Sequence, residues 1–239
     1  ISSGEPVIIL DGINFINGNG YFGSVNLLAK NSAFLKASIF NCSVTDSEDE
    51  DNTSGGAVYL TNWDSSQSDR TIGNTIISGN KTGGIRSQVT EDAIARWRII
   101  NTTICNNTTS EDDSGRGINV FTLDNGVLTA HIYNSIIWGN KQYDLEFRRN
   151  ITFEVDHSDI DNVDAGSGAV YQSGDGVVNV DPLFVDPENN DFHLQSSSSV
   201  IDAGVNQGIP SLDFEGETRV SGTTVDMGAD EYTTDGIYT

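Results

Sequence analysis

The residues of this chain that are best suited to acid–base chemistry include two lysines in equivalent surroundings. Lys81 and Lys141 each follow a Gly-Asn pair, and Arg86 lies shortly after the first of them. A polysaccharide lyase needs one cationic group to neutralise the carboxylate of a uronate and another group to remove the α-proton. Lys81, Lys141 and Arg86 are therefore the candidate catalytic residues, and solvated side chains at a turn are the alternative interpretation.

Carboxylates concentrate in two stretches of the chain, and each stretch is a candidate calcium site. Ca²⁺ takes about six to eight oxygen ligands, many of them carboxylates. Neither stretch has the spacing of an EF-hand loop, so solvated acidic loops are the alternative interpretation. The candidate ligands are Asp46, Glu48, Asp49, Asp51, Glu111, Asp112 and Asp113. Ca²⁺ is therefore the candidate cofactor, and a protein without any cofactor is the alternative.

Two tryptophans are candidates for stacking against a sugar ring, because an indole offers a large flat face. Trp63 lies in the polar stretch 61–65, where an aromatic side chain is expected to be exposed. Trp138 follows Ile136 and Ile137 and is expected to point outward from a packed strand. Trp63 and Trp138 are the candidate carbohydrate-binding residues, and incidental packing is the alternative for both.

A short phrase that recurs along the chain must position these side chains: a β-branched residue, then Asn, an apolar pair and a small-residue turn. Clear copies surround Asn41, Asn74, Asn101 and Asn134, and a weaker copy surrounds His157. The steps between these residues are 33, 27, 33 and 23, which suits one coil of a solenoid. Because Asn tolerates the left-handed backbone conformation, we expect it at a corner of each coil, with its amide paired to the next coil.

A second phrase follows in each coil, with a Gly at the head of an alternating strand. Gly56, Gly84 and Gly117 begin three of the copies. Gly permits either a positive φ or a close approach of the neighbouring coil. Equivalent strands stacked from coil to coil predict an all-β parallel β-helix of about six coils. Its core is predicted to contain a column formed by Ile39, Ile72, Ile99 and Ile132.

The composition agrees with an all-β fold and limits the partners. The chain has 35 acidic and 12 basic residues, a net charge of −23, which repels nucleic acid and anionic membranes. It has 36 % hydrophobic residues and 25 Gly, which favour short strands and tight turns. Cys42 and Cys105 lie two coils apart, about 9–10 Å, so both are predicted to be free thiols. Only the stretch 91–97 reads as a possible helical turn.

After about residue 175 the repeat stops and a different set of motifs begins. The chain reads VDPLF at 180–184, SVIDAG at 199–204 and VDMGADEY at 225–232. These motifs, in this order, resemble the terminal region of secreted bacterial proteins called choice-of-anchor Q domain proteins. The upstream coils are also similar to the repeats of polymorphic outer-membrane adhesins.

The resemblance implies a right-handed parallel β-helix of pectin-lyase type that is secreted or displayed on a bacterial surface. No signal peptide and no transmembrane run is apparent in the sequence. Because the chain opens on an apolar strand without a visible cap, we expect it to be part of a longer protein. Its targeting and anchoring segments are expected to lie outside the given residues.

The chain is divided into β-helix coils at 1–174, a capping region at 175–232 and a tail at 233–239. Val200, Ile201 and Phe214 are expected to cover the last open coil. The aspartates of the capping motifs are expected to accept hydrogen bonds in turns. Arg219, a rare cation in this region, is expected to form an ion pair with a neighbouring carboxylate.

Two classes of function remain open after the sequence is read. The first is a non-catalytic extracellular module that binds a glycan or mediates adhesion, and this class is favoured because no convergent acid–base pair stands out. The second is a lyase or hydrolase that acts on an extracellular, uronate-containing polysaccharide. A fold of this kind supports either class, so the decision depends on the site.

Overall fold

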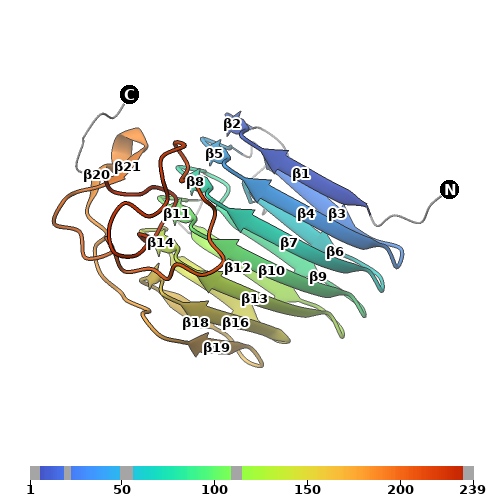
Figure 1. Cartoon of the computed structure of the whole chain (residues 1–239). Helices are drawn as coiled ribbons and strands as arrows, with labels where there is room; N and C mark the ends of the chain where they lie inside the picture. Colours follow the sequence, from blue (N-terminus) through green and yellow to red (C-terminus); the bar gives the residue numbers. More distant parts are fainter. Residues whose placement is uncertain (1–5, 19–22, 49–55, 109–114, 234–239) are drawn as a thin grey trace.

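The structure, a computed structural model, describes residues 6–18, 23–48, 56–108 and 115–233. Within these residues the chain forms strands β1 to β21 and one short 3-10 helix, Pro187–Asn189. No helix in these ranges has the length and apolar character needed to cross a bilayer. Figure 1 shows the strands stacked in parallel layers along one axis, with the C-terminal part of the chain packed against one side.

Three parallel sheets build the stack, and each coil contributes one strand to each sheet, except that the last coil contributes β19 to sheet A alone. Sheet A contains β1 (Val7–Asp11), β4 (Phe34–Phe40), β7 (Gln67–Gly73), β10 (Ile94–Ile100), β13 (Val127–Tyr133), β16 (Ile151–Asp156) and β19 (Val170–Ser173). Sheet B contains β2 (Asn14–Ile16), β5 (Ser43–Thr45), β8 (Ile76–Ser78), β11 (Thr103–Cys105), β14 (Ile136–Trp138) and β17 (Asp159–Ile160). Sheet C contains β3 (Val25–Ala29), β6 (Val58–Asn62), β9 (Ile85–Val89), β12 (Arg116–Thr122), β15 (Tyr143–Arg148) and β18 (Val163–Ala165).

The strand order is that of a parallel β-helix, so the predicted fold class is confirmed. Sheet A holds seven strands, which differs slightly from the expected six or so coils. A third strand per coil was not foreseen, because the three-residue strands of sheet B are too short to show an alternating pattern.

The column of isoleucines predicted for the core lies inside the helix. Ile39, Ile72, Ile99 and Ile132 are paired in register along sheet A, and each is at most 2 % exposed. Val155 continues the column in β16. Burial of one such side chain contributes about 1.5–3 kcal/mol, so the repeated column supplies much of the stability of each coil.

The recurring asparagines occupy the corner between sheets A and B, as predicted. Asn41, Asn74, Asn101 and Asn134 have φ of 52°, 46°, 46° and 51°, and His157 has 41°. Their amides, however, form a ladder only in part. The Asn74 side chain donates to Asn41 Oδ1 at 3.2 Å, whereas those of Asn101 and Asn134 donate to backbone carbonyls of the C-terminal region.

A more complete ladder runs through a different column, in the turn after sheet B. Asn80 Nδ2 donates to Asn107 Oδ1 at 2.9 Å, and Asn107 Nδ2 donates to Asn140 Oδ1 at 2.8 Å. Asn140 Nδ2 then donates to Asp144 Oδ1 at 2.7 Å. All four side chains are buried. The ladder therefore satisfies amides inside the coils and ends on a carboxylate.

Gly117 is required because the neighbouring coil approaches closely. A Cβ at this position would lie 2.8 Å from the carbonyl oxygen of Asp144. Of the two reasons proposed for this repeated Gly, the close approach is therefore the one that applies here.

The prediction of a possible helical turn at 91–97 is wrong. Strand β10 begins at Ile94 and pairs with β7 and β13 in register. Ala95 and Trp97 point into the core and are 0 % and 3 % exposed. The alternating burial that the two neighbouring strands impose outweighs the local helix preference of the segment.

Residues 175–233, called the C-terminal segment below, lie along the side of the helix. Val200 and Ile201, which were predicted to cover the last open coil, pack instead against the outer face of sheet B. Apolar residues on the outer face of sheet B form a second core with the segment, which lies beside this sheet in Figure 1. This core contains Cys105, Ile136, Phe184, Phe192, Leu194, Val200 and Met227, with Ile76, Trp138 and Ile201 packed against it. The first residues of the segment continue the stack, since Val178 forms a parallel bridge with Asp159 of β17 and Val177 packs against the core of the coils. The residues of the second core then follow the side of the coils.

Hydrogen bonds tie the C-terminal segment to successive coils. Asn74 Nδ2 donates to Leu212 O, Asn101 Nδ2 donates to Asp226 O, and Asn134 Nδ2 donates to Val205 O. The backbone N–H of Gly228 returns a bond to Asn134 O at 2.8 Å. The corner asparagines thus serve both the coil and the segment.

Arg219 is 1 % exposed but forms no direct ion pair among the described residues, contrary to the prediction. Its guanidinium donates to the carbonyl oxygens of Ala229, at 2.9 Å, and Gly228. Burial lowers the pKa of Arg219, and the nearby carboxylates of Glu231 and Asp213 oppose this shift. The carboxylates accept hydrogen bonds from backbone N–H groups in turns, as was predicted. Asp213 Oδ1, for example, accepts from Glu215 N at 3.0 Å.

Candidate functional site

The two predicted sugar-binding tryptophans occupy different surroundings, and only Trp138 lies in a pocket. It ends β14, next to Cys105 of β11 in the parallel register. The side chains of Trp138 and Cys105 both face outward. The residue before each of them, Ile137 or Ile104, lies in the core of the β-helix, and successive side chains of a strand point to opposite faces. The chain then turns at Gly139, with φ of 65°, and at Asn106, with φ of 55°. These turns leave the end of the strands open to the C-terminal segment.

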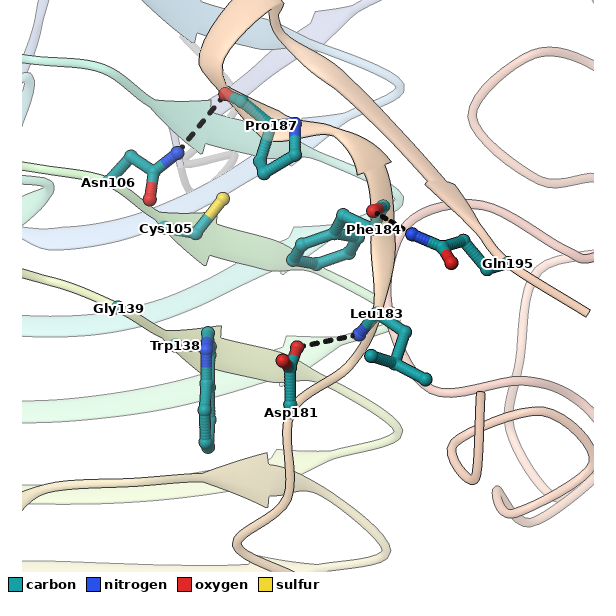
Figure 2. A pocket seen from close by; sticks show the side chains of 9 residues that line it. All are labelled: Cys105, Asn106, Trp138, Gly139, Asp181, Leu183, Phe184, Pro187 and Gln195. Atoms are coloured by element: carbon teal, nitrogen blue, oxygen red, sulfur yellow. Dashed lines mark hydrogen bonds between the residues drawn. The ribbon is translucent and has the colours of Figure 1, made fainter. Parts of the chain in front are cut away.

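The pocket forms where the C-terminal segment passes over this edge of sheet B. Its volume is about 270 Å³. Figure 2 shows Trp138 on the β-helix side and Asp181, Leu183 and Phe184 on the segment side. Leu183 has φ of 54°, which turns the segment toward strand β20 (Phe184–Asp186). The lining residues are Cys105, Asn106, Trp138, Gly139, Asp181, Leu183, Phe184, Pro187 and Gln195.

The polar side chains of the pocket are fixed by the backbone of the C-terminal segment. Asp181 Oδ1 accepts from the N–H of Leu183 at 2.9 Å (Figure 2). Gln195 and Asn106 donate their amides to backbone carbonyls at 2.8 and 3.1 Å. Asp181 Oδ2, Gln195 Oε1 and Asn106 Oδ1 accept no hydrogen bond from any described residue. The pocket therefore combines an indole with three acceptor oxygens.

Cys105 is not a nucleophile in this pocket. Burial raises the pKa of its thiol well above the ordinary value, and the charge of Asp144 adds to the shift. The thiolate is the reactive form of cysteine, so a protonated, buried thiol contributes only packing. Cys42 is likewise buried, and both cysteines are free, as predicted.

Trp63 lies away from the described pocket, in the turn between β6 and β7, and is 38 % exposed. Its backbone N–H donates to Ala29 O at 2.9 Å, so the turn is held to the preceding coil. Its exposure agrees with the expectation from the polar sequence. Unlike Trp138, it is not among the lining residues of the described pocket.

Lys81 and Lys141 lie in one column of turns, as their spacing suggested. The N–H of Lys81 donates to Ser47 O at 2.8 Å, and that of Lys141 donates to Asn107 O at 3.1 Å. The Lys81 ammonium is engaged by Glu48, and this hydrogen bond raises its pKa. A lysine that acts as a general base needs a lowered pKa, so the surroundings of Lys81 oppose that role.

Glu146 gathers two cations on the outer face of sheet C. It is 7 % exposed. Its Oε1 accepts from Arg148 Nη2 at 2.7 Å, and its Oε2 accepts from Arg116 and from Asn119 Nδ2, the latter at 2.7 Å. The two guanidiniums are therefore already paired with a carboxylate.

Arg86, the third catalytic candidate, lies beside this group. It is in register with Asn119 of the next strand. Its guanidinium stacks over the ring of Phe121, with 5.2 Å from Cζ to the ring centroid, and it hydrogen-bonds to Tyr59. Burial lowers its pKa, although an arginine stays charged at neutral pH. The structure thus places Arg86 on a sheet face and the two lysines in turns.

The calcium candidates divide into described and undescribed residues. Asp46 has φ of 54° at the end of β5, and Glu48 is bound to Lys81. Since the Glu48 carboxylate is paired with an ammonium, it is not arranged for a cation. The remaining candidates lie outside the described residues: Asp49, Asp51, Glu111, Asp112 and Asp113.

Two buried carboxylates were not identified from the sequence. Burial raises the pKa of Asp159 to about 7, against one hydrogen bond from Val180 N at 3.0 Å. Asp159 Oδ2 has no partner in the described chain. Burial also raises the pKa of Asp144 to about 6, which hydrogen bonds from Asn140 and Asn162 only partly offset.

The pocket residues of the C-terminal segment were also missed, although a signal was present. Asp181, Leu183 and Phe184 belong to the VDPLF motif at 180–184. That motif was interpreted as part of a cap. An outward Trp138 beside an apolar Cys105 was the complementary signal, because an apolar outer face on a coil requires a covering partner.

Comparisons with known proteins assign no family to this chain. No protein-family model and no curated protein matches the sequence. The crystal structure of pectate lyase Pel9A matches 97 % of this chain and 90 % of that chain, with 15 % identity and a TM-score of 0.32. The class of this protein, a parallel β-helix, rests on its own strand order. The likeness to Pel9A carries no argument about activity.

Proposed function

We propose that this chain is a non-catalytic β-helix module that binds a glycan in the Trp138 pocket. The observation that carries the proposal is the pairing of an outward indole with three acceptor oxygens around one concave site. Sugar hydroxyls are hydrogen-bond donors, and the apolar face of a pyranose ring stacks on an aromatic ring. Ligand sites of this kind are concave, with an apolar lining and a few fixed polar groups.

The pocket favours a neutral sugar over a uronate. Its oxygens accept hydrogen bonds, and no described lysine or arginine is among its lining residues. A uronate carboxylate would meet Asp181 without a compensating cation, and like charges at short range disfavour binding. The expected ligand is therefore a hydroxyl-rich, uncharged segment of a polysaccharide.

The expected location and partner follow from the same proposal. The module is secreted or displayed on a bacterial surface, where an extracellular polysaccharide or cell-surface glycan is its partner. The order of the C-terminal motifs, which resembles that of choice-of-anchor Q proteins, supports this assignment. The net charge of −23 favours partners that are not polyanions.

Isothermal titration tests the proposal with neutral oligosaccharides of β-glucan, mannan and xylan, and with an oligogalacturonate of equal length. We expect a neutral oligosaccharide to bind, and Trp138→Ala to weaken it at least tenfold, which corresponds to about 1.4 kcal/mol. Trp63→Ala is the matched control, since it removes an exposed indole outside the pocket, and it leaves the affinity unchanged. Loss of binding in Trp63→Ala but not in Trp138→Ala would overturn the assignment of the pocket.

A lyase acting on a uronate-containing polysaccharide is the second candidate, favoured by one observation. Arg86, Arg116 and Arg148 lie on neighbouring strands of sheet C, and cations of this kind neutralise a uronate. Against it, Arg116 and Arg148 are paired with Glu146, and Lys81 is paired with Glu48. The test is ultraviolet absorbance of unsaturated product formed from the polysaccharide in the presence of Ca²⁺. Absorbance with the wild type that disappears in Lys81→Ala, Lys141→Ala or Arg86→Ala would establish the lyase instead.

A further inference from the structure

The C-terminal segment brings together three side chains of types that can bind a metal. They are His193 of β21 (Asp191–Leu194), Glu215 of the following loops and Asp230 near the end of the segment. One ligand atom from each lies within 4.8 Å of the others. Their positions in sequence are far apart, so the fold and not a local motif creates the group.

His193 is oriented toward the centre of this group. Its Nδ1 lies 2.6 Å from Asp191 Oδ1, and its Nε2 lies 3.2 Å from Glu215 Oε2. When Nδ1 carries the proton, it donates to Asp191, and the lone pair of Nε2 faces Glu215 and Asp230. A carboxylate on the second ring nitrogen is the usual partner of a metal-bound histidine, because it fixes the tautomer and the ring plane.

Charge around the group is strongly negative. Asp191, Glu215 and Asp230 contribute three carboxylates, and the buried carboxylate of Asp213 acts on Asp230 as well. The nearby guanidinium of Arg219 donates to backbone carbonyls and not to these carboxylates. A divalent cation would compensate the excess charge directly.

We propose that His193, Glu215 and Asp230 form a binding site for a divalent transition metal of the zinc type. One imidazole nitrogen and two carboxylate oxygens form a three-ligand set that Zn²⁺ accepts, with water in the fourth position. Ca²⁺ prefers about six to eight oxygens and does not seek an imidazole. A tetrahedral ion with bonds of about 2.1 Å holds its ligands about 3.4 Å apart, so small side-chain rotations complete the site.

The ion would join three parts of the C-terminal segment that otherwise meet through loops. Strand β21 pairs with β20, whose Phe184 lines the Trp138 pocket. Metal binding therefore stiffens one wall of that pocket from behind. The site itself rests on its own residues and does not depend on whether the pocket binds a sugar.

The experiment measures Zn²⁺ binding to metal-stripped protein by isothermal titration and by thermal unfolding at pH 8. The alkaline pH is chosen for His193, because burial alone lowers its pKa but Asp191, Asp230 and Glu215 together raise it. We expect one equivalent of Zn²⁺ and a rise in Tm, since a ligand that binds only the folded state stabilises it. His193→Gln abolishes both effects, and Asp230→Asn weakens binding at least tenfold.

His131→Gln provides the matched control. His131 Nε2 also contacts a carboxylate, Asp156 Oδ2 at 2.8 Å, but belongs to no three-ligand group among the described residues. This variant keeps full Zn²⁺ binding. Visible d–d absorption of the Co²⁺-substituted wild type, of the intensity of a four- or five-coordinate ion, gives a second readout that needs no variant. Absent or multiple weak binding, or binding retained in His193→Gln, would overturn the site.

Discussion

The coils and the C-terminal segment are stabilised by different means, although they share one surface. In the coils, a buried column of side chains is repeated in register, and each coil needs only its neighbours. In the segment, the strands are short, and buried charged groups hold the backbone: Asp213, Asp226, Glu231 and Arg219 each bond to N–H or C=O groups. The coils therefore spread their stabilisation over repeated contacts, whereas the segment concentrates it in a few charged residues.

Arg219→Met tests that dependence and carries the largest expected effect. It removes the donors to Gly228 and Ala229 and leaves the surrounding carboxylates without a cation. Hydrogen bonds to a charged group contribute about 1.5–3 kcal/mol each, so the loss of two of them should cost about 3–5 kcal/mol in urea unfolding. Hydrogen exchange should show loss of protection in 175–233 while sheet A stays protected.

Arg96→Met is the control for that prediction. Arg96 is exposed, and its nearest carboxylate contact is Asp69 at 3.7 Å. A change of less than about 0.5 kcal/mol is expected there. Equal losses in the two variants, or loss of protection in the coils with Arg219→Met, would contradict the contrast between the two regions.

Asn107→Ala sharpens the comparison from the side of the coils. Asn107 makes four side-chain hydrogen bonds, to Asn80, Ile77 and Asn140. Removal leaves buried partners unsatisfied, and we expect about 3 kcal/mol of destabilisation in urea. Loss of protection should concentrate in the coils on either side of this residue.

The exposed Asn125 supplies the control for the ladder. Its amide donates to Asp92 Oδ1 at 3.0 Å across two turns. Asn125→Ala should change stability by less than about 0.5 kcal/mol. An Asn107→Ala variant as stable as this control would show that the interior ladder contributes nothing to the free energy of unfolding.

Asp159→Asn gives the smallest effect and has the opposite sign. The pKa of Asp159 is raised to about 7, above its ordinary 3.8, so the folded state keeps a proton that the unfolded state has lost. Stability from this group is full below about pH 4 and is lost as the pH rises through about 7. At pH 8 the substitution should gain about 1 kcal/mol, and the decline of Tm from pH 5 to 8 should flatten.

Asp144→Asn is the matched comparison for this pH effect. Asp144 accepts from four N–H groups of Asn140, Asp161 and Asn162. An amide nitrogen would face some of these donors, so this variant should lose about 1–3 kcal/mol despite the raised pKa. Stabilisation by both substitutions would indicate that the buried charge alone determines the effect on stability, and that the N–H groups around each carboxylate do not.

The fold was predictable from sequence because its signals repeat. The isoleucine column and the left-handed Asn corners recur from coil to coil. The strands of one coil can therefore be predicted from the equivalent residues of the others. The stretch 91–97 was misread because one copy was judged by local propensity alone. Its alternation at Ala95 and Trp97 becomes evident only beside the neighbouring strands.

The site was less predictable, because it depends on contacts between distant segments. Trp138 was identified as outward, but Asp181 and Gln195 reach it only after the C-terminal segment folds back along sheet B. Similarly, the meeting of His193 with Glu215 and Asp230 has no sequence period. Such juxtapositions occur once in the chain, so no internal repeat could reveal them.

The hydrogen bonds from Asn74, Asn101 and Asn134 to the C-terminal segment have a mechanical consequence. A solenoid bound only by neighbours unravels coil by coil from either end. Here one segment is hydrogen-bonded to three successive coils, so these coils are expected to unfold together. Under tension the middle of the rod should therefore yield in one large step, with smaller steps from the coils that the segment does not reach.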